Sequence, residues 1–537
     1  MGSRALCRLF LVPLLVGLTT WANAQAFRVQ CPTTTSMHPA AGANSATGAQ
    51  YTGPTTFTDP ITGLSYTSNG GQIKCQQVSG GDGYATMADG TQIYMFSFGP
   101  LSGLANIANG QPGTVTPDTF NQVFNGNLQP GDPATTDTGT SAADLAAFTY
   151  NGAVGLSPNL DASVGNGTAG PIDGHVDPRP IMDVGVMNGN QPAPLMAIDE
   201  DDEFFLTLTN VGMLMRPDLF EQHTIHFHGY PNASSFYDGV PDASVAINIG
   251  GSMSYYYLAP DAGTYFWHCH ITPPEHLQMG MVGQLYVRPR QNRVPVGNKL
   301  FASLQAQQAD LRTASNCVAD ILCTTPQPIA DSGFKQAVDP LTSSPYKYAY
   351  NDGDGSTRYD VEYPLQIHGF DPNFHFVGMT FNPENFAGMK DKYFLLNGRS
   401  YPDTVQAGPM QTPSADGVNH FSQPLPSIIN IPAGGRALLR ISDLDVTEYQ
   451  TLASLGIPMQ VIAQNARLLR DQAGANMYYN SNSITLAGGE SIDVILDASD
   501  TSKYPSGSTF FLYTPNLDHL ANDAENFGGL MTEVHIN

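Results

Sequence analysis

Charged residues are scarce in this chain of 537 residues, where they make up 13% of the sequence. So low a fraction argues against a coiled coil and against a highly charged disordered chain. Cationic residues are scarcer still, because 22 Lys and Arg stand against 47 Asp and Glu and leave a formal net charge of −25. Phosphate binding depends on clustered cations, so neither nucleic acid nor an acidic lipid surface is an expected partner.

Long apolar runs are also lacking. The first, at residues 9–18, is far shorter than the ~20 residues that a membrane span needs, and no later stretch qualifies. It follows two arginines and precedes Ala22-Asn23-Ala24, small residues typical of a signal-peptide cleavage site. We therefore expect a signal peptide at residues 1–24, no membrane anchor, and export to the periplasm or the extracellular space.

Cysteine is rare, with six residues in all, one of which lies in the expected signal peptide. An oxidising compartment makes disulfides plausible for the others. Cys317 and Cys323 are close enough to close a small loop, and Cys31 with Cys75 would fasten the N-terminal segment, although spacing alone does not fix the connectivity. Such a pairing leaves Cys269 without a partner, and its neighbours suggest another role.

The chain is rich in what loops require, with 54 Gly and 40 Pro beside 41% hydrophobic residues. It also exceeds the roughly 250–300 residues at which single cores stop growing. Short β-rich segments bounded by turn residues form one series from Gln92–Phe98 to Gly283–Val287, and a second from Tyr363–His368 to Thr532–Ile536. This pattern predicts an all-β fold with two antiparallel sandwiches in tandem.

Changes in composition give the expected domain boundaries. Similar text near the end of each series, Gly263-Thr-Tyr-Phe-Trp and Gly507-Ser-Thr-Phe-Phe, supports a repeat of one sandwich type. The linker holds an expected helix near Leu300–Ala314. The predicted division is a signal peptide at 1–24, an irregular segment at 25–84, a first domain at 85–290 with an insertion at about 101–178, a linker at 291–355 and a second domain at 356–537.

Two short segments hold six of the 13 histidines: His-Thr-Ile-His-Phe-His-Gly at 223–229, and Trp-His-Cys-His-Ile-Thr-Pro-Pro-Glu-His-Leu-Gln-Met-Gly-Met at 267–281. Side chains alternate between the two faces of a strand. If the two segments pair as neighbouring strands, their metal-binding side chains therefore divide into two clusters, one on each face. One cluster would contain His223 and Cys269, completed by His276 and Met281 from the following loop. The other would contain the four histidines His226, His228, His268 and His270.

The first cluster offers two imidazoles, a thiolate and a thioether, the ligand set of a blue electron-transfer copper site. Zinc is the alternative metal, but zinc sites rarely include a thioether. Met279 is a second candidate for the axial ligand. The second cluster offers imidazoles alone, which suits copper that meets dioxygen or another small substrate. The bonds from Cys269 to its neighbours His268 and His270 would join the two clusters, so these three residues are the expected electron carriers.

These segments resemble the copper motifs of multicopper oxidases, which are built from cupredoxin domains with Greek-key sandwiches. Further similar text is Asp238-Gly-Val-Pro and Phe394-Leu-Leu-Asn-Gly-Arg; the resemblance is strong over about 181–290 and weaker over about 360–537. It implies a type 1 copper on His223, Cys269, His276 and, by the family spacing, Met281. It further implies that His226 serves a type 2 ion, and that His228, His268 and His270 serve a type 3 pair.

Two departures from the family pattern matter. Cys269 and His276 are seven positions apart where the oxidases have five, and Glu275 in the stretched loop is expected to be a solvated carboxylate. Copper nitrite reductases, which resemble this family, tolerate longer loops. The family's trinuclear cluster uses eight histidines, whereas 457–463 and 512–514, where matching motifs would fall, contain none. The second domain is therefore expected to be copper-free, and the close pair His368 and His375 is expected not to bind metal.

The sequence thus predicts an exported copper oxidoreductase that oxidises a small reducing substrate or a redox protein and reduces dioxygen. Electrons would enter through a solvent-facing edge of His276, and a neighbouring subunit or atypical ligands would complete the cluster. Two alternatives stay open. One is a nitrite-reductase-like enzyme with its catalytic copper on His228 and His268, and the other is a non-enzymatic carrier or buffer of copper. A homo-oligomer is compatible with each.

Overall fold

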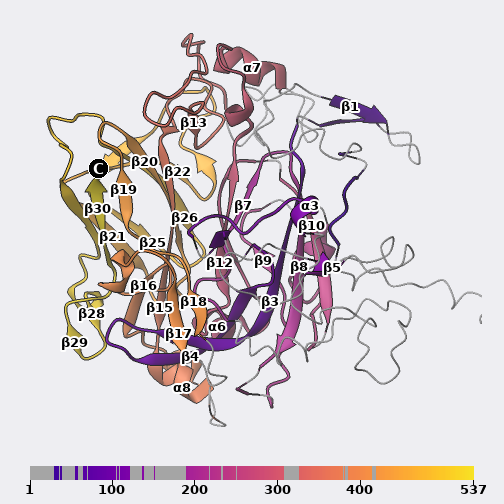
Figure 1. Ribbon diagram of the computed structural model, residues 1–537, viewed down its shortest axis with the longest axis vertical. Helices are drawn as coiled ribbons and strands as arrows, with labels where there is room; N and C mark the ends of the chain where they lie inside the picture. The colour runs from indigo at the N-terminus through magenta and orange to yellow at the C-terminus, as the bar shows by residue number, and fades with distance from the viewer. Residues whose placement is uncertain are drawn as a thin grey trace, which may run out of the picture.

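The computed structural model describes residues 30–38, 70–120, 189–307 and 326–537, apart from short gaps within these ranges, and four short strands in 55–68 and 136–151. Figure 1 shows the magenta strands of a first sandwich beside the orange and yellow strands of a second. The expected signal peptide, most of the expected insertion and the pair Cys317 and Cys323 lie outside the described residues. No helix in the described ranges is long and apolar enough to cross a membrane.

The first sandwich consists of two four-stranded sheets with the strand orders β10-β8-β3-β4 and β7-β12-β11-β9. β3 runs parallel to β8 and β7 parallel to β12, while the other neighbours are antiparallel. The strands are β3 (Ile73–Thr86), β4 (Gln92–Pro100), β7 (Met196–Asp199), β8 (Glu203–Gly212), β9 (His226–Phe227), β10 (Ser252–Leu258), β11 (Gly263–His268) and β12 (Val282–Arg288).

The second sandwich repeats this topology, with β26-β20-β15-β16 within one sheet and β19-β30-β27-β21 within the other. Its parallel pairs, β15 with β20 and β19 with β30, occupy the same places in the order. The strands are β15 (Val361–Phe370), β16 (Tyr393–Leu396), β19 (Ile429–Ile431), β20 (Arg436–Asp443), β21 (Gln450–Leu455), β26 (Ser491–Asp497), β27 (Thr509–Tyr513) and β30 (Met531–Ile536). The predicted all-β fold of two tandem cupredoxin-like sandwiches is confirmed.

Shorter elements fill the edges and connections. The strands among them are β1 (Thr55–Thr58), β2 (Ser65–Ser68), β5 (Thr136–Asp137), β6 (Tyr150–Asn151), β13 (Lys347–Tyr348), β14 (Arg358–Tyr359), β17 (Met410–Pro413), β18 (Asn419–Gln423), β22 (Met459–Gln464), β23 (Arg467–Leu468), β24 (Tyr479–Ser481), β25 (Ser483–Leu486), β28 (Ala521–Asn522) and β29 (Glu525–Asn526). The helices are α3 (Pro117–Phe120), α6 (Pro273–Gln278), α7 (Leu300–Gln307), α8 (Pro372–Gly378) and the 3-10 helices η2 (Ser235–Tyr237), η3 (Arg290–Arg293), η4 (Phe386–Gly388), η5 (Asp403–Val405) and η6 (Leu517–His519).

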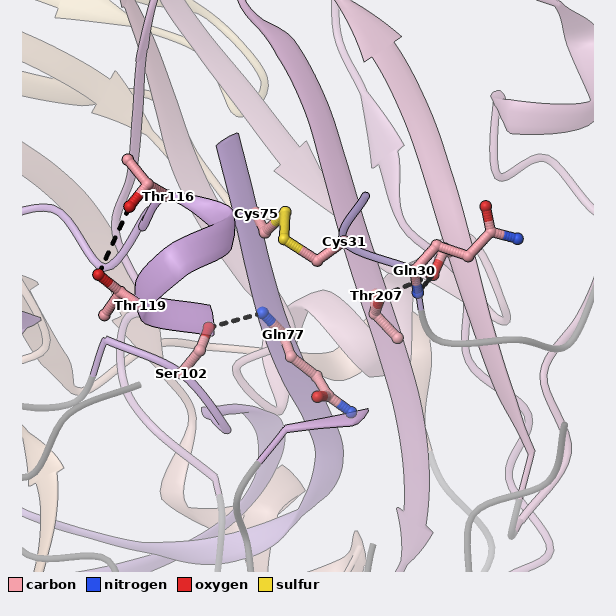
Figure 2. The surroundings of a disulfide bond; sticks show 9 residues. Gln30, Cys31, Cys75, Gln77, Ser102, Thr116, Thr119 and Thr207 are labelled. Carbon is pink, nitrogen blue, oxygen red and sulfur yellow. Dashed lines mark hydrogen bonds between the residues drawn. A yellow bond between two sulfur atoms is a disulfide. The ribbon is translucent and has the colours of Figure 1, made fainter. Parts of the chain in front are cut away.

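One expectation about the N-terminal segment is wrong. Residues 25–84 were expected to be irregular, but β3 begins at Ile73 and is the central strand between β8 and β4. Its Gly and Gln residues do not form an alternating polar and apolar pattern, because both faces of this central strand are buried. Cys75 on this strand forms a disulfide with Cys31, as predicted, and so fastens the preceding segment to the sheet (Figure 2).

Polar contacts join the two sandwiches. Thr264 in β11 donates a hydrogen bond to Asp493 of β26 at 2.6 Å, and Gln284 in β12 donates to Ser442 of β20 at 2.6 Å. Glu362 of β15 receives hydrogen bonds from the buried guanidinium of Arg440 at 2.7 Å and from Arg288 of β12 at 3.0 Å. The second sandwich is therefore fixed against β11, the strand that leads to Cys269.

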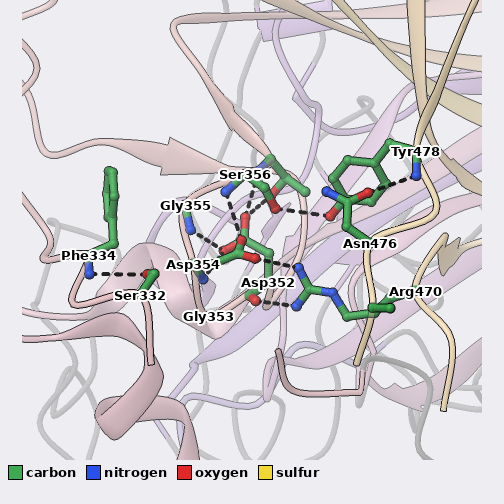
Figure 3. Close-up of polar contacts among 12 residues, drawn as sticks. Ser332, Phe334, Asp352, Gly353, Asp354, Gly355, Ser356, Arg470, Asn476 and Tyr478 are labelled. Carbon is green, nitrogen blue, oxygen red and sulfur yellow. Dashed lines mark hydrogen bonds and ion pairs between the residues drawn. The ribbon is translucent and has the colours of Figure 1, made fainter. Parts of the chain in front are cut away.

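Polar contacts also attach the end of the linker, around Asp352 and Asp354, to the second sandwich. The Asp352 side chain accepts hydrogen bonds from the backbone amides of Asp354, Gly355 and Thr357, while Asp354 pairs with Arg470 at 2.7 Å (Figure 3). Both carboxylates are satisfied by the protein itself, so this acidic loop orders the linker and needs no cation.

Candidate metal centre

Three side chains from separate parts of the first sandwich meet in its core. His223 forms an isolated β-bridge with Ile247, Cys269 follows the end of β11, and His276 lies in α6. The Cys269 sulfur lies 3.9 Å from Nδ1 of His223 and 3.2 Å from Nδ1 of His276. All three are fully buried, and their donor atoms lie within 4.8 Å of one another. We call them the first ligand group.

The stretched loop owes its geometry to a short helix that the sequence analysis did not predict. Pro273 and Pro274 occupy the first two positions of α6, where a proline needs no hydrogen-bonded amide. The helix brings His276 under Cys269 and lets Met281 donate its amide to the His276 carbonyl at 2.8 Å. Glu275 is buried in this helix, so the expectation of a solvated carboxylate is wrong.

The electrostatics of the first group favour a bound cation. Burial opposes a charge on His276, but the Cys269 sulfur and the Glu221 carboxylate raise the pKa of His276 to about 10. Burial and the neighbouring His276 lower the pKa of His223 well below its ordinary value. Nε2 of His223 is buried without a hydrogen-bond partner, while its Nδ1 faces the sulfur. Two imidazoles and a thiolate turned inward in this way fit a copper ion.

The two methionines differ in their surroundings. Met279 points toward α8, since a Cβ built on Gly378 would lie 3.2 Å from its sulfur. Met281 is also fully buried, and its carbonyl accepts the Cys269 amide at 3.1 Å, which keeps it beside the first group. The sulfur of Met279 thus lies against α8, while the choice of Met281 as the thioether ligand rests on the family spacing and stays a prediction.

The edge of His276 is not open to solvent, contrary to the prediction. His276 is completely buried, and its Nε2 faces a carboxylate oxygen of Glu221 at 3.4 Å. Glu221 itself is about a quarter exposed, so it is the group that connects the histidine to the surface. Nothing in the sequence distinguishes Glu221 from other acids, because its role depends on a contact across the fold.

A second ligand group, formed by His226, His228 and His268, lies on the opposite face of the same strands. Their nitrogens also fall within 4.8 Å of one another, and Nε2 of His228 lies 3.0 Å from Nε2 of His268. The ring of His270 lies 5.0 Å from that of His226. The structure therefore brings His223, Cys269 and His276 together on one face, and His226, His228 and His268 on the other, as alternation of side chains along strands requires. The predicted fourth histidine, His270, lies beside His226 but does not belong to the group of three.

Hydrogen bonds determine which ring nitrogens of His226 and His268 remain available to a metal ion. Nδ1 of His226 donates to the Asp238 carbonyl at 2.7 Å, and Nδ1 of His268 donates to the Cys269 carbonyl at 2.5 Å, which leaves each Nε2 available. Burial lowers the pKa of His268 well below its ordinary value and that of His228 to about 4, so both imidazoles are neutral, the form that binds metal. Asp238 belongs to the Asp-Gly-Val-Pro text already noted.

The second sandwich reaches this group, but none of its described residues supplies a histidine to it. Gly489 lies so close that an added Cβ would be 2.8 Å from Nδ1 of His228. In the second sandwich, the place of β9 in the strand order is taken by β21 at Gln450–Leu455. The prediction that residues 457–463 correspond to the first histidine motif was therefore wrong. Neither stretch contains histidine. His375 instead packs between two carbonyls, and within the described ranges neither it nor His368 belongs to a group that could hold a metal.

A cavity of about 470 Å³ opens beside His228. Phe266, Leu277 and the first turn of α6 line it on one side, and the second sandwich lines it with the segments 445–449 and 487–489. The second ligand group thus faces a space between the two sandwiches, whereas the first group is closed.

Comparisons with known proteins agree with this geometry. The family model described as multicopper oxidase matches residues 173–292. Laccase abr2 of Aspergillus fumigatus is 32% identical over 128 residues, 24% of this chain and 20% of that protein. A copper-containing nitrite reductase of Rhizobium meliloti is 35% identical over 109 residues, 19% of this chain and 26% of that protein. The chain therefore spans a fifth to a quarter of the length of these relatives.

Among solved structures, the blue copper oxidase from Nitrosomonas europaea aligns with 87% of this chain and 86% of its own, at 16% identity and a TM-score of 0.46. The family match covers both ligand groups, from His223 to Met281. Residues 173–292 are thus similar to multicopper oxidases, and this similarity covers both ligand groups but less than a quarter of the chain.

Proposed function

We propose that this protein is a copper-dependent oxidoreductase that takes electrons singly at the first ligand group and delivers them to dioxygen at the second. The donor would be a small reducing substrate or a redox protein. One observation carries the proposal: the two groups lie back to back, with Cys269 in one and its chain neighbour His268 in the other. Export from the cytoplasm remains a prediction from the N-terminal sequence.

Copper, when bound, supplies an exchange between two oxidation states, and the protein supplies its surroundings. The Cys269 thiolate, His223, His276 and the thioether of Met281 would hold the first ion away from water, since all four residues are fully buried. Asp238 keeps His226 in the tautomer that presents Nε2. The hydrogen bond from His268 to the Cys269 carbonyl adds a second path to the covalent one between the groups.

Nitrite reduction is a second candidate. It is supported by the similarity to the Rhizobium meliloti nitrite reductase and by the second group, whose three clustered imidazoles suffice for a single ion. The two candidates differ in the number of copper ions. The nitrite-reductase type needs one ion at the second group, whereas the oxidase needs a trinuclear cluster, which a neighbouring subunit or atypical ligands would complete.

Metal analysis with electron paramagnetic resonance on copper-loaded protein tests the proposal. More than two ions per chain with donor-dependent oxygen uptake supports the oxidase, and two ions with nitrite consumption supports the second candidate. A single ion with neither activity supports a carrier or buffer of copper and overturns both enzymatic proposals. Size-exclusion chromatography on the same sample shows whether a neighbouring subunit is present.

A further inference from the structure

The cavity beside His228 has an acidic wall that belongs to the second sandwich. Asp445 and Thr447 line it, and Asp391 lies behind them, with Asp391 7% and Asp445 2% exposed. The two carboxyls are in hydrogen-bond contact with each other. They converge on Gly369, where an added Cβ would meet an oxygen of Asp391 at 2.2 Å and one of Asp445 at 2.8 Å.

Neutral groups make the other hydrogen bonds to this carboxyl pair. The Thr447 hydroxyl lies 2.5 Å from Asp391 and 3.0 Å from Asp445, and so bridges both acids at the cavity wall. Gln450 donates to Asp445 at 2.6 Å, and Gln278 of α6 donates to Asp391 at 3.0 Å. The pair is thereby connected to the cavity on one side and to the helix of His276 on the other.

Two buried carboxyls in contact cannot both be ionised at low cost, so the pair retains a proton between them. Burial and the Asp445 charge raise the pKa of Asp391 well above its ordinary value. Other titratable groups nearby are Asp443 and Glu448 on the same segment, His368 on β15, and His519, which contacts Gln450 and Glu448. Asp443 is itself buried with a raised pKa, and burial keeps His368 neutral by lowering its pKa to about 4. A transferable proton is thus stored beside the second ligand group.

We propose that this cavity is where the electron acceptor is reduced, and that the Asp391–Asp445 pair donates protons to it through the Thr447 hydroxyl. The inference rests on the proposed function. The acceptor is a small oxygen-containing molecule whose reduction consumes protons. Dioxygen takes four electrons and four protons to give two waters, and nitrite takes one electron and two protons to give nitric oxide and water. The electrons come from the donor through the first group, and solvent entering the cavity returns protons to the pair.

The test uses copper-loaded full-length protein and the variants Asp445→Asn and Thr447→Val, the second of which removes only the bridging hydroxyl. Asp360→Asn is the control, because Asp360 is a buried carboxyl bonded to Asp339 and lies outside the cavity lining. Anaerobic reduction of the blue site by the donor measures electron entry. Oxygen uptake and nitrite consumption across pH, in light and heavy water, measure proton delivery.

We expect unchanged electron entry in all variants, and a kcat that falls about 100-fold in Asp445→Asn and Thr447→Val with an altered pH profile and solvent isotope effect. Asp445→Glu should restore part of the loss. Wild-type kinetics in both variants, or an equal loss in Asp360→Asn, overturns the inference alone. A wild type that consumes neither dioxygen nor nitrite overturns the proposed function and this inference with it.

Discussion

The buried side chain of Gln278 connects the second sandwich to α6, the helix of His276, and replacing it should change both the stability of the fold and the properties of the first ligand group. Gln278 is fully buried in α6, two residues after His276. Its amide donates to Asp391 at 3.0 Å and its carbonyl oxygen accepts the Asp371 amide at 2.8 Å. Its own backbone carbonyl lies 2.9 Å from Nε2 of His375. We predict that Gln278→Leu destabilises the protein and shifts the reduction potential of the first site.

The magnitude follows from the two lost hydrogen bonds. Each leaves a buried polar group without a partner, at about 1–3 kcal/mol apiece, so we expect a loss of roughly 2–6 kcal/mol in the free energy of unfolding. Because α6 also contains His276 of the first ligand group, a shift of this helix should alter the visible absorption of copper-loaded protein.

Chemical denaturation and redox titration measure the two effects, with Gln222→Leu as the control. Gln222 adjoins the ligand His223, but its hydrogen bond to Asn248 is exposed, so the control should lose less than about 1 kcal/mol. If Gln278→Leu unfolds like the wild type and the reduction potential of its copper-loaded form is unchanged, the second sandwich does not position α6.

Three further predictions follow from particular contacts. Burial opposes the charge on Glu362, but Arg288 and Arg440 outweigh it and lower the pKa of this carboxyl from 4.5 to about 2. The carboxylate therefore stabilises the fold fully above pH 4.5 and loses that contribution as the pH falls toward 2. In acid denaturation, the free energy of unfolding of Glu362→Gln should lack this pH-dependent contribution of about 3 kcal/mol. Replacing Cys31 and Cys75 by serine opens a loop of 44 residues and should cost about 4 kcal/mol, measured by calorimetry against the wild type. His228→Ala should abolish turnover and remove copper from the second group while the blue absorption remains, and loss of both signals together would refute the separation of the two groups.

The local signals in the sequence were sufficient for most strands and for the ligand groups. Thr509–Tyr513 forms β27 with the predicted bounds, and the predicted segment Thr532–Ile536 lies within β30, whose residues alternate between partly buried and buried. Alternation also placed Cys269 and His268 on opposite faces, because the parity of a strand is a local property. The same rule failed for Ile73–Thr86, since a central strand buried on both faces carries no period of two.

Contacts between distant segments were not predictable. Glu221 against His276, Gln278 between Asp371 and Asp391, and Gly489 against His228 each depend on how the sandwiches pack, which no spacing within one segment encodes. No helix was predicted in the stretched loop, where Pro273 and Pro274 occupy the first positions of α6.

The central claim is that the Cys269 thiolate and its histidines bind a copper ion in the core of the first sandwich. Absorption spectroscopy of copper-loaded wild type and Cys269→Ser tests it most directly. We predict an intense visible band in the wild type that is missing from the serine variant, which should still bind copper at the second group. Colourless wild-type protein, or an unchanged spectrum after the substitution, would contradict the account.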